Sequence, residues 1–104
     1  MPESIINFGS LNIDHVYGVV DFVQPGETLA SLDYKQFVGG KGLNQSIALA
    51  RAGADVFHVG CIGKEGALLK KTLKDDDINV ENVVEIDAPS GHAIIQVNAK
   101  GENC

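Results

Sequence analysis

A glycine-rich stretch followed by an alanine-rich segment constrains the fold of this chain more than any other feature. Three glycines occur within four residues, at Gly39, Gly40 and Gly42, directly after an extended apolar segment. Residues 43–52 then carry the pattern of a thin helix, and Gly53 stands where a left-handed helix stop is expected. Glycine lets a ligand approach the main chain closely, and a helix start directs N–H groups with partial positive charge towards it. The pattern predicts a binding turn at the start of a rigid helix.

This turn departs from both common phosphate-binding loops. A Walker loop requires Ser or Thr after its lysine, but Gly42 follows Lys41. A dinucleotide-binding fingerprint requires a third glycine, and Gln45 stands at that position. A glycine turn that serves only tight packing is the alternative interpretation.

Length and composition narrow the class of protein. The 104 residues correspond to about one small domain, and 44% hydrophobic residues are enough to bury a core. The net charge of −6 argues against a nucleic-acid partner. No apolar run approaches the ~20 residues needed to cross a bilayer, so no membrane partner is expected. Two cysteines, Cys61 and Cys104, and a start without a basic leader predict a cytoplasmic protein.

Strand and helix patterns alternate along the chain. Short apolar runs at 5–9 and 56–63 each end in glycine, which is typical of buried strands. A strand, a helix and a second strand joined by a long crossover predict parallel pairing. Residues 65–76 read as a surface helix, and 78–86 as another strand. The predicted fold class is α/β with a parallel sheet, in which Cys61 is buried.

Two further regions predict β-structure outside that sheet. Residues 16–23 are β-branched and aromatic, 24–27 form a turn, and 28–38 are extended again, which together indicate a hairpin. Residues 92–98 read as a strand, and 99–102 as a hairpin turn. Because the first hairpin interrupts the strand–helix unit, we expect it to project from the sheet as a flap or lid.

Polar side chains follow the first strand, where ligands bind in open α/β sheets. Asn12 and Asp14 are two residues apart, so in an extended segment both point the same way. An amide and a carboxylate together suit sugar hydroxyls, while an Asx turn that closes the strand is the alternative. Asn44, in the first helical turn, can bind a ligand or cap the backbone. His15 is expected to be a packing or surface residue, because no second His or Cys offers metal-ligand spacing.

The motifs resemble those of a known family. Residues 39–45, Gly-Gly-Lys-Gly-Leu-Asn-Gln, with the alanine-rich helix ending at Ala52 and Gly53, resemble the first signature of the PfkB-type sugar kinases, the ribokinase-like family. Residues 9–14 resemble the substrate-binding first strand of that family. Other short segments follow in the family's order, at 25–28, 62–66, 90–93 and 101–103. The resemblance covers nearly the whole chain and is strongest to the ribokinase branch.

The resemblance implies a fold and an activity. The fold is a Rossmann-like, mainly parallel sheet with helices and a small β-sheet lid, whose strands lie around 14–38 and 92–104; the lid closes over the sugar and makes a homodimer contact. The activity is ATP-dependent phosphorylation of a sugar hydroxyl, with Mg²⁺ on the phosphates and ribose, a related monosaccharide or a nucleoside as substrate. The implied substrate-binding residues are Asn12, Asp14, Gly39, Gly40, Lys41 and Asn44. The side chain of Lys41 is treated as structural or solvated.

The chain departs from the family pattern at two points. Glu65 stands where the family usually has Asp, which affects only the geometry of that turn. The second signature, Asp-x-x-Gly-Ala-Gly-Asp, is absent from these residues, and the resemblance assigns to it the catalytic base, the anion hole and much of the nucleotide site. We therefore expect residues 1–104 to be the N-terminal, sugar-binding portion of one ribokinase-like domain, without a catalytic base or activity of their own. Alternatives are a non-catalytic sugar-binding or lid-mediated interaction module, and an oxidoreductase nucleotide domain, which the missing third glycine disfavours.

Overall fold

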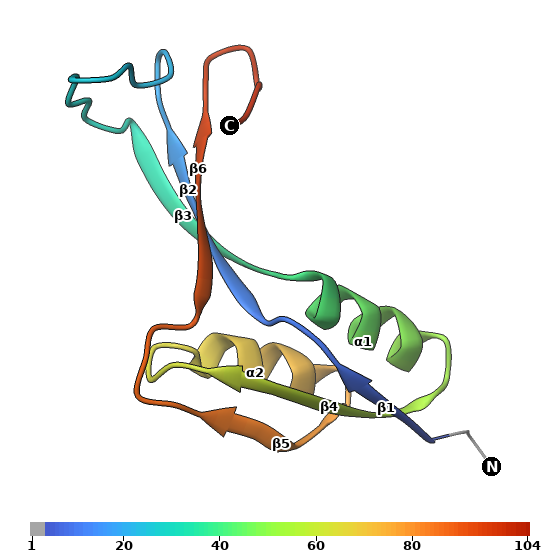
Figure 1. Cartoon of the computed structure of the whole chain (residues 1–104). Coiled ribbons are helices and arrows are strands. Elements are labelled where there is room, and N and C mark those ends of the chain that lie inside the picture. The colour runs from blue at the N-terminus through green and yellow to red at the C-terminus, as the bar shows by residue number, and fades with distance from the viewer. Residues whose placement is uncertain (1–3) are drawn as a thin grey trace. The chain divides into compact units, whose positions relative to one another are not determined.

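The computed structural model describes residues 4–104, and these fold into two compact units (Figure 1). The first unit comprises residues 4–13 and 38–91, and the second comprises residues 14–37 and 92–104. The elements in chain order are β1 (Ser4–Phe8), β2 (Asn12–Gly18), β3 (Asp33–Gly39), α1 (Lys41–Arg51), β4 (Asp55–Ile62), α2 (Ala67–Asp75), β5 (Asn79–Glu85) and β6 (Gly91–Val97).

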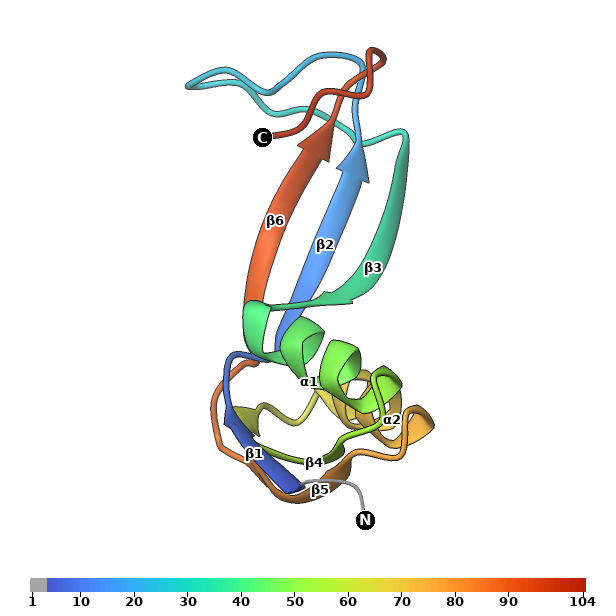
Figure 2. The same cartoon turned by 90° about the vertical axis from the view of Figure 1, so that its right-hand side faces the viewer.

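The first unit is built on a three-stranded sheet with the order β1-β4-β5. Both pairs of strands are parallel, and Ile5 of β1 lies beside Val56 of β4. Figures 1 and 2 show α1 and α2 on the same face of this sheet. Same-face helices are expected, because right-handed crossovers are the rule and both connections step in the same direction across the sheet. The α/β fold class with a parallel sheet is confirmed.

The ends of α1 follow from local sequence. The helix begins directly after Gly40, which has a φ of 102°, and Gly53 beyond its last turn has a φ of 101°. The Gly53 N–H donates to the Ala50 carbonyl at 3.0 Å, and the Ala54 N–H donates to the Leu49 carbonyl at 3.1 Å. These two bonds form a Schellman motif, which satisfies the last carbonyls of the helix. The predicted glycine stop is confirmed.

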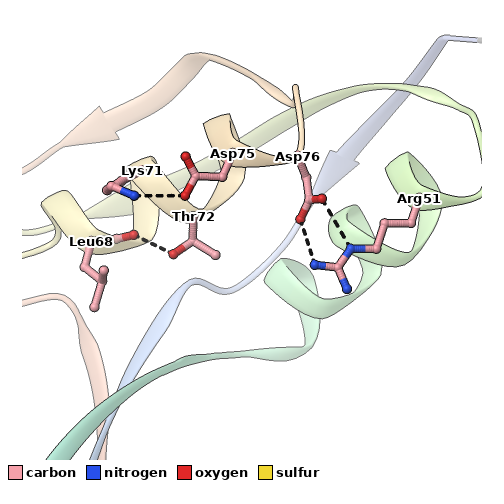
Figure 3. Close-up of polar contacts among 6 residues, drawn as sticks. All are labelled: Arg51, Leu68, Lys71, Thr72, Asp75 and Asp76. Atoms are coloured by element: carbon pink, nitrogen blue, oxygen red, sulfur yellow. Dashed lines mark hydrogen bonds and ion pairs between the residues drawn. The ribbon is translucent and has the colours of Figure 1, made fainter.

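The core lies between the helices and the sheet. Leu43 of α1 and Leu69 and Leu73 of α2 are fully buried, whereas Leu68 is 42% exposed, so α2 presents a narrower apolar face than its leucines suggest. On the outer surface, the Arg51 guanidinium donates to both oxygens of Asp76, and the Lys71 ammonium lies 2.9 Å from Asp75 (Figure 3). Exposed pairs of this kind each stabilise a fold by about 0–1 kcal/mol, so burial of the leucines dominates.

The opposite face of the parallel sheet carries large apolar side chains that no element of the first unit covers. Ile6 is 63% exposed, Phe8 75% and Val84 54%. Cys61 pairs with Val84 in the β4–β5 register and is also exposed, so the prediction that Cys61 is buried is wrong. Alternate residues of a strand point to opposite faces. The helices cover the face that carries Val56 and Ile62, and Cys61 lies on the other.

The second unit is a three-stranded sheet with the order β3-β2-β6. Figure 2 shows β2 and β6 running in the same direction and β3 in the opposite one. The predicted strand bounds 16–23 and 28–38 are wrong, because β2 ends at Gly18 and β3 begins at Asp33. The Gly18 N–H donates to the Asp33 carboxylate at 3.0 Å, and the Gly18 carbonyl accepts from Leu32 at 2.7 Å. These bonds close the strand pair before the apolar run ends.

Both predicted turns of the second unit are present. The Glu27 N–H donates to the Gln24 carbonyl at 3.0 Å, across Gly26 with a φ of 79°. After β6 the chain reverses and pairs with itself, with two backbone bonds between Gln96 and Cys104 of 2.9 and 3.0 Å.

In the part of the chain from 4 to 104, no helix has the length and apolar character needed to span a membrane.

Candidate functional site

The glycine turn touches the end of the first strand backbone to backbone. A Cβ atom placed on Gly42 would lie 2.4 Å from the Cα of Gly9, and one on Gly9 would lie 2.4 Å from the Cα of Gly42. Non-bonded carbons need about 3.5 Å or more. Only glycine at both positions lets α1 begin directly against the carboxyl end of β1. The glycines therefore serve close packing, and that packing places the turn at the edge of the sheet where ligands bind in open α/β folds.

Hydrogen bonds hold the turn against the segment that follows β1. The first-turn N–H groups of a helix have no partner within the helix, and that of Leu43 donates to the Ser10 carbonyl at 3.0 Å. A Cβ on Gly40 would lie 2.7 Å from the same carbonyl oxygen and 3.2 Å from the Asn12 nitrogen. Gly40, with a φ of 102°, is thus required both by its conformation and by its neighbours.

The structure brings most of the predicted ligands together in the first unit. Asn12 begins β2 beside Gly40, and Gly39 is buried at the end of β3. Lys41 and Asn44 lie exposed in the first turn of α1. A Cβ on Gly91 would lie 2.4 Å from the side-chain oxygen of Asn12, so the Asn12 amide packs against the start of β6.

Asp14 lies in β2 two residues after Asn12, in the part of the strand that belongs to the second unit. It is half-buried. The extended conformation predicted for this pair is confirmed, because both residues lie in one strand. The role of Asp14 as a ligand stays a prediction.

A buried polar network that the sequence analysis did not identify lies directly beneath the turn. The Asn7 amide nitrogen lies 3.0 Å from the Gly42 carbonyl oxygen and 2.9 Å from the Ser46 hydroxyl. That hydroxyl lies 2.6 Å from Nδ1 of His58, and Nε2 of His58 lies 3.0 Å from the Gly9 carbonyl oxygen. Burial lowers the pKa of His58, and the hydrogen bond to Gly9 opposes this in part. A polar residue inside each apolar run, at Asn7 and His58, was the available sequence signal.

Glu65, the residue that departs from the family pattern, has a defined contact. Its carboxylate accepts a short hydrogen bond from the Ser90 N–H, and the Ser90 hydroxyl accepts from the Gly63 N–H at 2.7 Å. Ser90 is 3% exposed. These two hydrogen bonds join the end of β4 to the segment before β6. The Glu65 carboxylate therefore has a structural role, with the Ser90 backbone as its partner.

No group of three or more His, Cys, Asp or Glu side chains in residues 4–104 is arranged to hold a metal ion.

Nδ1 of His15 lies 2.6 Å from the Tyr34 hydroxyl oxygen, and the two rings stack with 5.9 Å between their centroids. His15 is half-buried and packs on this ring, in agreement with its prediction as a packing or surface residue.

Comparison with known families identifies one match. Residues 2–104 match the pfkB family carbohydrate kinases. A ribokinase of Haemophilus influenzae is 38% identical to this chain over 106 residues, which cover 99% of this chain and 35% of the relative. A bifunctional ribokinase/ribose-5-phosphate isomerase A of Fructilactobacillus sanfranciscensis is 40% identical, with 97% of this chain and 19% of the relative covered. The chain thus spans about a third or less of the length of these relatives.

Solved structures are similar over the same extent. A ribokinase from Cryptococcus neoformans in complex with ADP superimposes with a TM-score of 0.90 at 36% identity, covering 100% of this chain and 33% of that one. An Arabidopsis thaliana ribokinase complexed with ribose and ATP gives a TM-score of 0.85 at 27% identity, with 99% and 34% covered.

Proposed function

Because this chain belongs to the pfkB family of carbohydrate kinases and has the ribokinase-type fold, we propose that it carries the sugar-binding part of an ATP-dependent sugar kinase. The substrate is ribose or a related monosaccharide or nucleoside, and the reaction takes place in the cytoplasm. Asn12, Gly39, Gly40 and Asn44 supply the ligands of the first unit, and Asp14 supplies the carboxylate. Lys41 lies within the same motif, exposed at the helix start.

One observation carries this proposal. The Gly9–Gly42 contact brings the turn at residues 39–41 against the backbone at Ser10 and Asn12, so amide, peptide and helix-start groups gather at one sheet edge. Sugar hydroxyls both donate and accept hydrogen bonds, and such a mixed set satisfies both. The positive end of α1 also stabilises charge that develops on a nearby hydroxyl oxygen.

The ribokinase structures in complex with ADP and with ribose and ATP support the proposal that the reaction uses ATP. Mg²⁺ would be held chiefly by the phosphates of the nucleotide, and residues 4–104 contain no group of three or more His, Cys, Asp or Glu side chains arranged to bind a metal ion. We therefore assign no metal ligand among these residues. The signature that the sequence analysis associates with the base and anion hole is not among these 104 residues, so we propose that they do not phosphorylate sugar alone.

Ribose binding by the chain tests the proposal. Calorimetric titration should detect ribose and not NAD, and Asn12→Ala should weaken the ribose affinity at least tenfold. Asn82→Ala, an exposed asparagine on β5, is the matched control and should bind as the parent does. Equal ribose affinity in the parent, Asn12→Ala and Asn82→Ala proteins would refute the sugar site. Binding of NAD without binding of ribose would also refute it. ATP-dependent phosphorylation of ribose by pure residues 1–104 would refute the assignment of catalysis to other residues.

We further propose that the second unit forms a homodimer contact. Its exposed apolar side chains include Leu32 and Phe37, which are 71% and 52% exposed. A hollow of about 390 Å³ lies on the face that carries Leu32 and Phe37. Apolar patches of this kind rarely stay exposed in monomers. Sedimentation should show dimers that Phe37→Asp dissociates, and a monomer at high micromolar concentration would contradict the contact.

A further inference from the structure

The directions of the hydrogen bonds in the network beneath the turn can be assigned from chemistry alone. A carbonyl oxygen only accepts, so the Asn7 atom near the Gly42 carbonyl is its NH₂ group, which also donates to Ser46. A carbonyl likewise accepts from Nε2 of His58, so that nitrogen carries a hydrogen. In a neutral ring Nδ1 is then bare and accepts the hydroxyl hydrogen of Ser46. The bonds run in one direction, from Asn7 to the Gly9 carbonyl.

The two ends of this network lie on the glycines that pack against each other. Asn7 holds the carbonyl of Gly42, and His58 holds the carbonyl of Gly9. Ser10, which follows Gly9, accepts the Leu43 N–H and contacts Gly40. A change in the network therefore acts on the two backbone segments that form the proposed sugar site.

Protonation of His58 would disrupt the hydrogen bonds that run from Asn7 through Ser46 and His58 to the Gly9 carbonyl. A ring with hydrogens on both nitrogens no longer accepts from Ser46, so the serine hydroxyl must turn away. A helical serine commonly donates to the carbonyl four residues earlier, which is Gly42, and that carbonyl already accepts from Asn7. Ser46 and His58 are both 0% exposed, so water does not replace the lost partner.

The hydrogen bonds of the His58 ring come from two elements. From α1 the ring meets Ser46, and from β1 it meets the Gly9 carbonyl, with Asn7 behind the serine. Within β4 its neighbour is the backbone of Gly60. None of these groups titrates, so a proton taken up in this cluster resides on His58.

We propose that Asn7, Ser46 and His58 are positioning residues that hold the turn at residues 39–41 in its sugar-binding geometry only while His58 is neutral. The inference rests on the proposed sugar site for its consequence, and on the geometry of the first unit for its mechanism. Sugar affinity then falls with pH in the acid range, although none of the three side chains is assigned as a ligand.

The first experiment follows the backbone by NMR without any sugar. As pH is lowered from 7.5 to 5.0, the amide signals of Gly9, Ser10, Gly42 and Leu43 should shift along one titration curve, shared with the His58 ring. The ring nitrogens at pH 7.5 should show the hydrogen on Nε2. Independent titration of these amides, or a hydrogen on Nδ1 at pH 7.5, would overturn the inference whether or not the chain binds sugar.

The second experiment measures the ribose dissociation constant over the same pH range. It should rise about threefold in the parent protein at the pH where the NMR titration shows two thirds of the His58 rings protonated, because only the neutral form holds the turn. In the variant Asn7→Val, Ser46→Ala, His58→Phe, the three polar side chains are removed together, so none of them is left without its side-chain partner, and only the Gly9 and Gly42 carbonyls each lose a donor. Because no titrating group remains in the network, the affinity of this variant should be independent of pH. If this variant does not fold, His58→Gln replaces it. His15→Asn, on the second unit, should keep the dependence of the parent.

The outcomes separate the two proposals. Parent and His58 variants with the same pH dependence would overturn the positioning role and leave the sugar site standing. No ribose binding at any pH would refute the sugar site, and the NMR titration would still decide whether the network controls the turn.

Discussion

His58 makes the stability of the first unit depend on pH. Its pKa in the folded chain lies below the ordinary 6.5, chiefly because burial disfavours the charged ring. In the unfolded chain the ring is solvated and has the ordinary pKa. As the pH falls, the unfolded state therefore takes up the proton first. The contribution of His58 to stability is complete above pH 6.5 and is lost as the pH falls from 6.5 towards the folded-state pKa.

The size of the loss follows from proton linkage. When the unfolded state binds one proton more than the folded state, the free energy of unfolding falls by about 1.4 kcal/mol for each pH unit. Small domains have total stabilities of about 5–15 kcal/mol, so one unit is a substantial fraction. For a chain of this length, 1 kcal/mol corresponds to about 4–8 °C in Tm.

Urea unfolding followed by circular dichroism at pH 7.5, 6.5 and 5.5 measures this slope. The matched variant is His58→Gln, which places an amide donor near the Gly9 carbonyl and does not titrate. The stability of the parent should fall relative to the variant by up to about 1 kcal/mol between pH 6.5 and 5.5, because the unfolded ring is only half protonated at pH 6.5, and by less between 7.5 and 6.5. His15→Asn controls for the other rings and should retain the slope of the parent. Parallel curves for parent and His58→Gln would refute the reasoning.

Other predictions concern the site, the glycine contact and the uncovered sheet face. Asp14→Ala should raise the ribose dissociation constant about 30-fold, the equivalent of ~2 kcal/mol for unpaired polar groups, and unchanged affinity would remove Asp14 from the site. Gly42→Ala, whose Cβ would lie 2.4 Å from Gly9, should destabilise the chain by about 1–3 kcal/mol in urea unfolding. Gly26→Ala has open space around it and should cost only the strain of its positive φ, about 1 kcal/mol, so equal losses would contradict the packing argument. Phe8→Ser, at a position that is 75% exposed, should reduce aggregation measured by light scattering, and unchanged scattering would count against this face as its cause.

The helix start and stop could be predicted because their causes are local. Gly40 and Gly53 both have φ near 100°, a conformation that glycine adopts at little cost, so their spacing marks the ends of α1. The ends of β2 and β3 could not be read in the same way. The apolar run continues past Gly18, but the Asp33 carboxylate and the Leu32 N–H close the strand pair there. Such a closure depends on which segment lies opposite.

The exposure of Cys61 shows a similar limit. Periodicity places Cys61 on one face of β4, but it does not say which face the helices cover. That choice follows from the handedness of the crossovers, and the leucines of both helices share one core cluster with Val56 and Ile62. A nearly continuous apolar run is typical of a strand buried on both sides, whereas in the described chain the helices cover β4 on one side only.

The sequence by itself determined the α/β class, the glycine turn, the rigid helix behind it and the family, because each depends on residues close together in the chain. Tertiary structure alone decided what lies beneath the turn. Asn7 is 39 residues from Ser46, and His58 is 49 residues from the Gly9 carbonyl it contacts. Nothing in the sequence indicates that an asparagine in one apolar run and a histidine in another belong to the same hydrogen-bond network. They become partners because parallel pairing places β1 beside β4, and because Gly9 and Gly42 let α1 approach closely enough for Ser46 to lie between them.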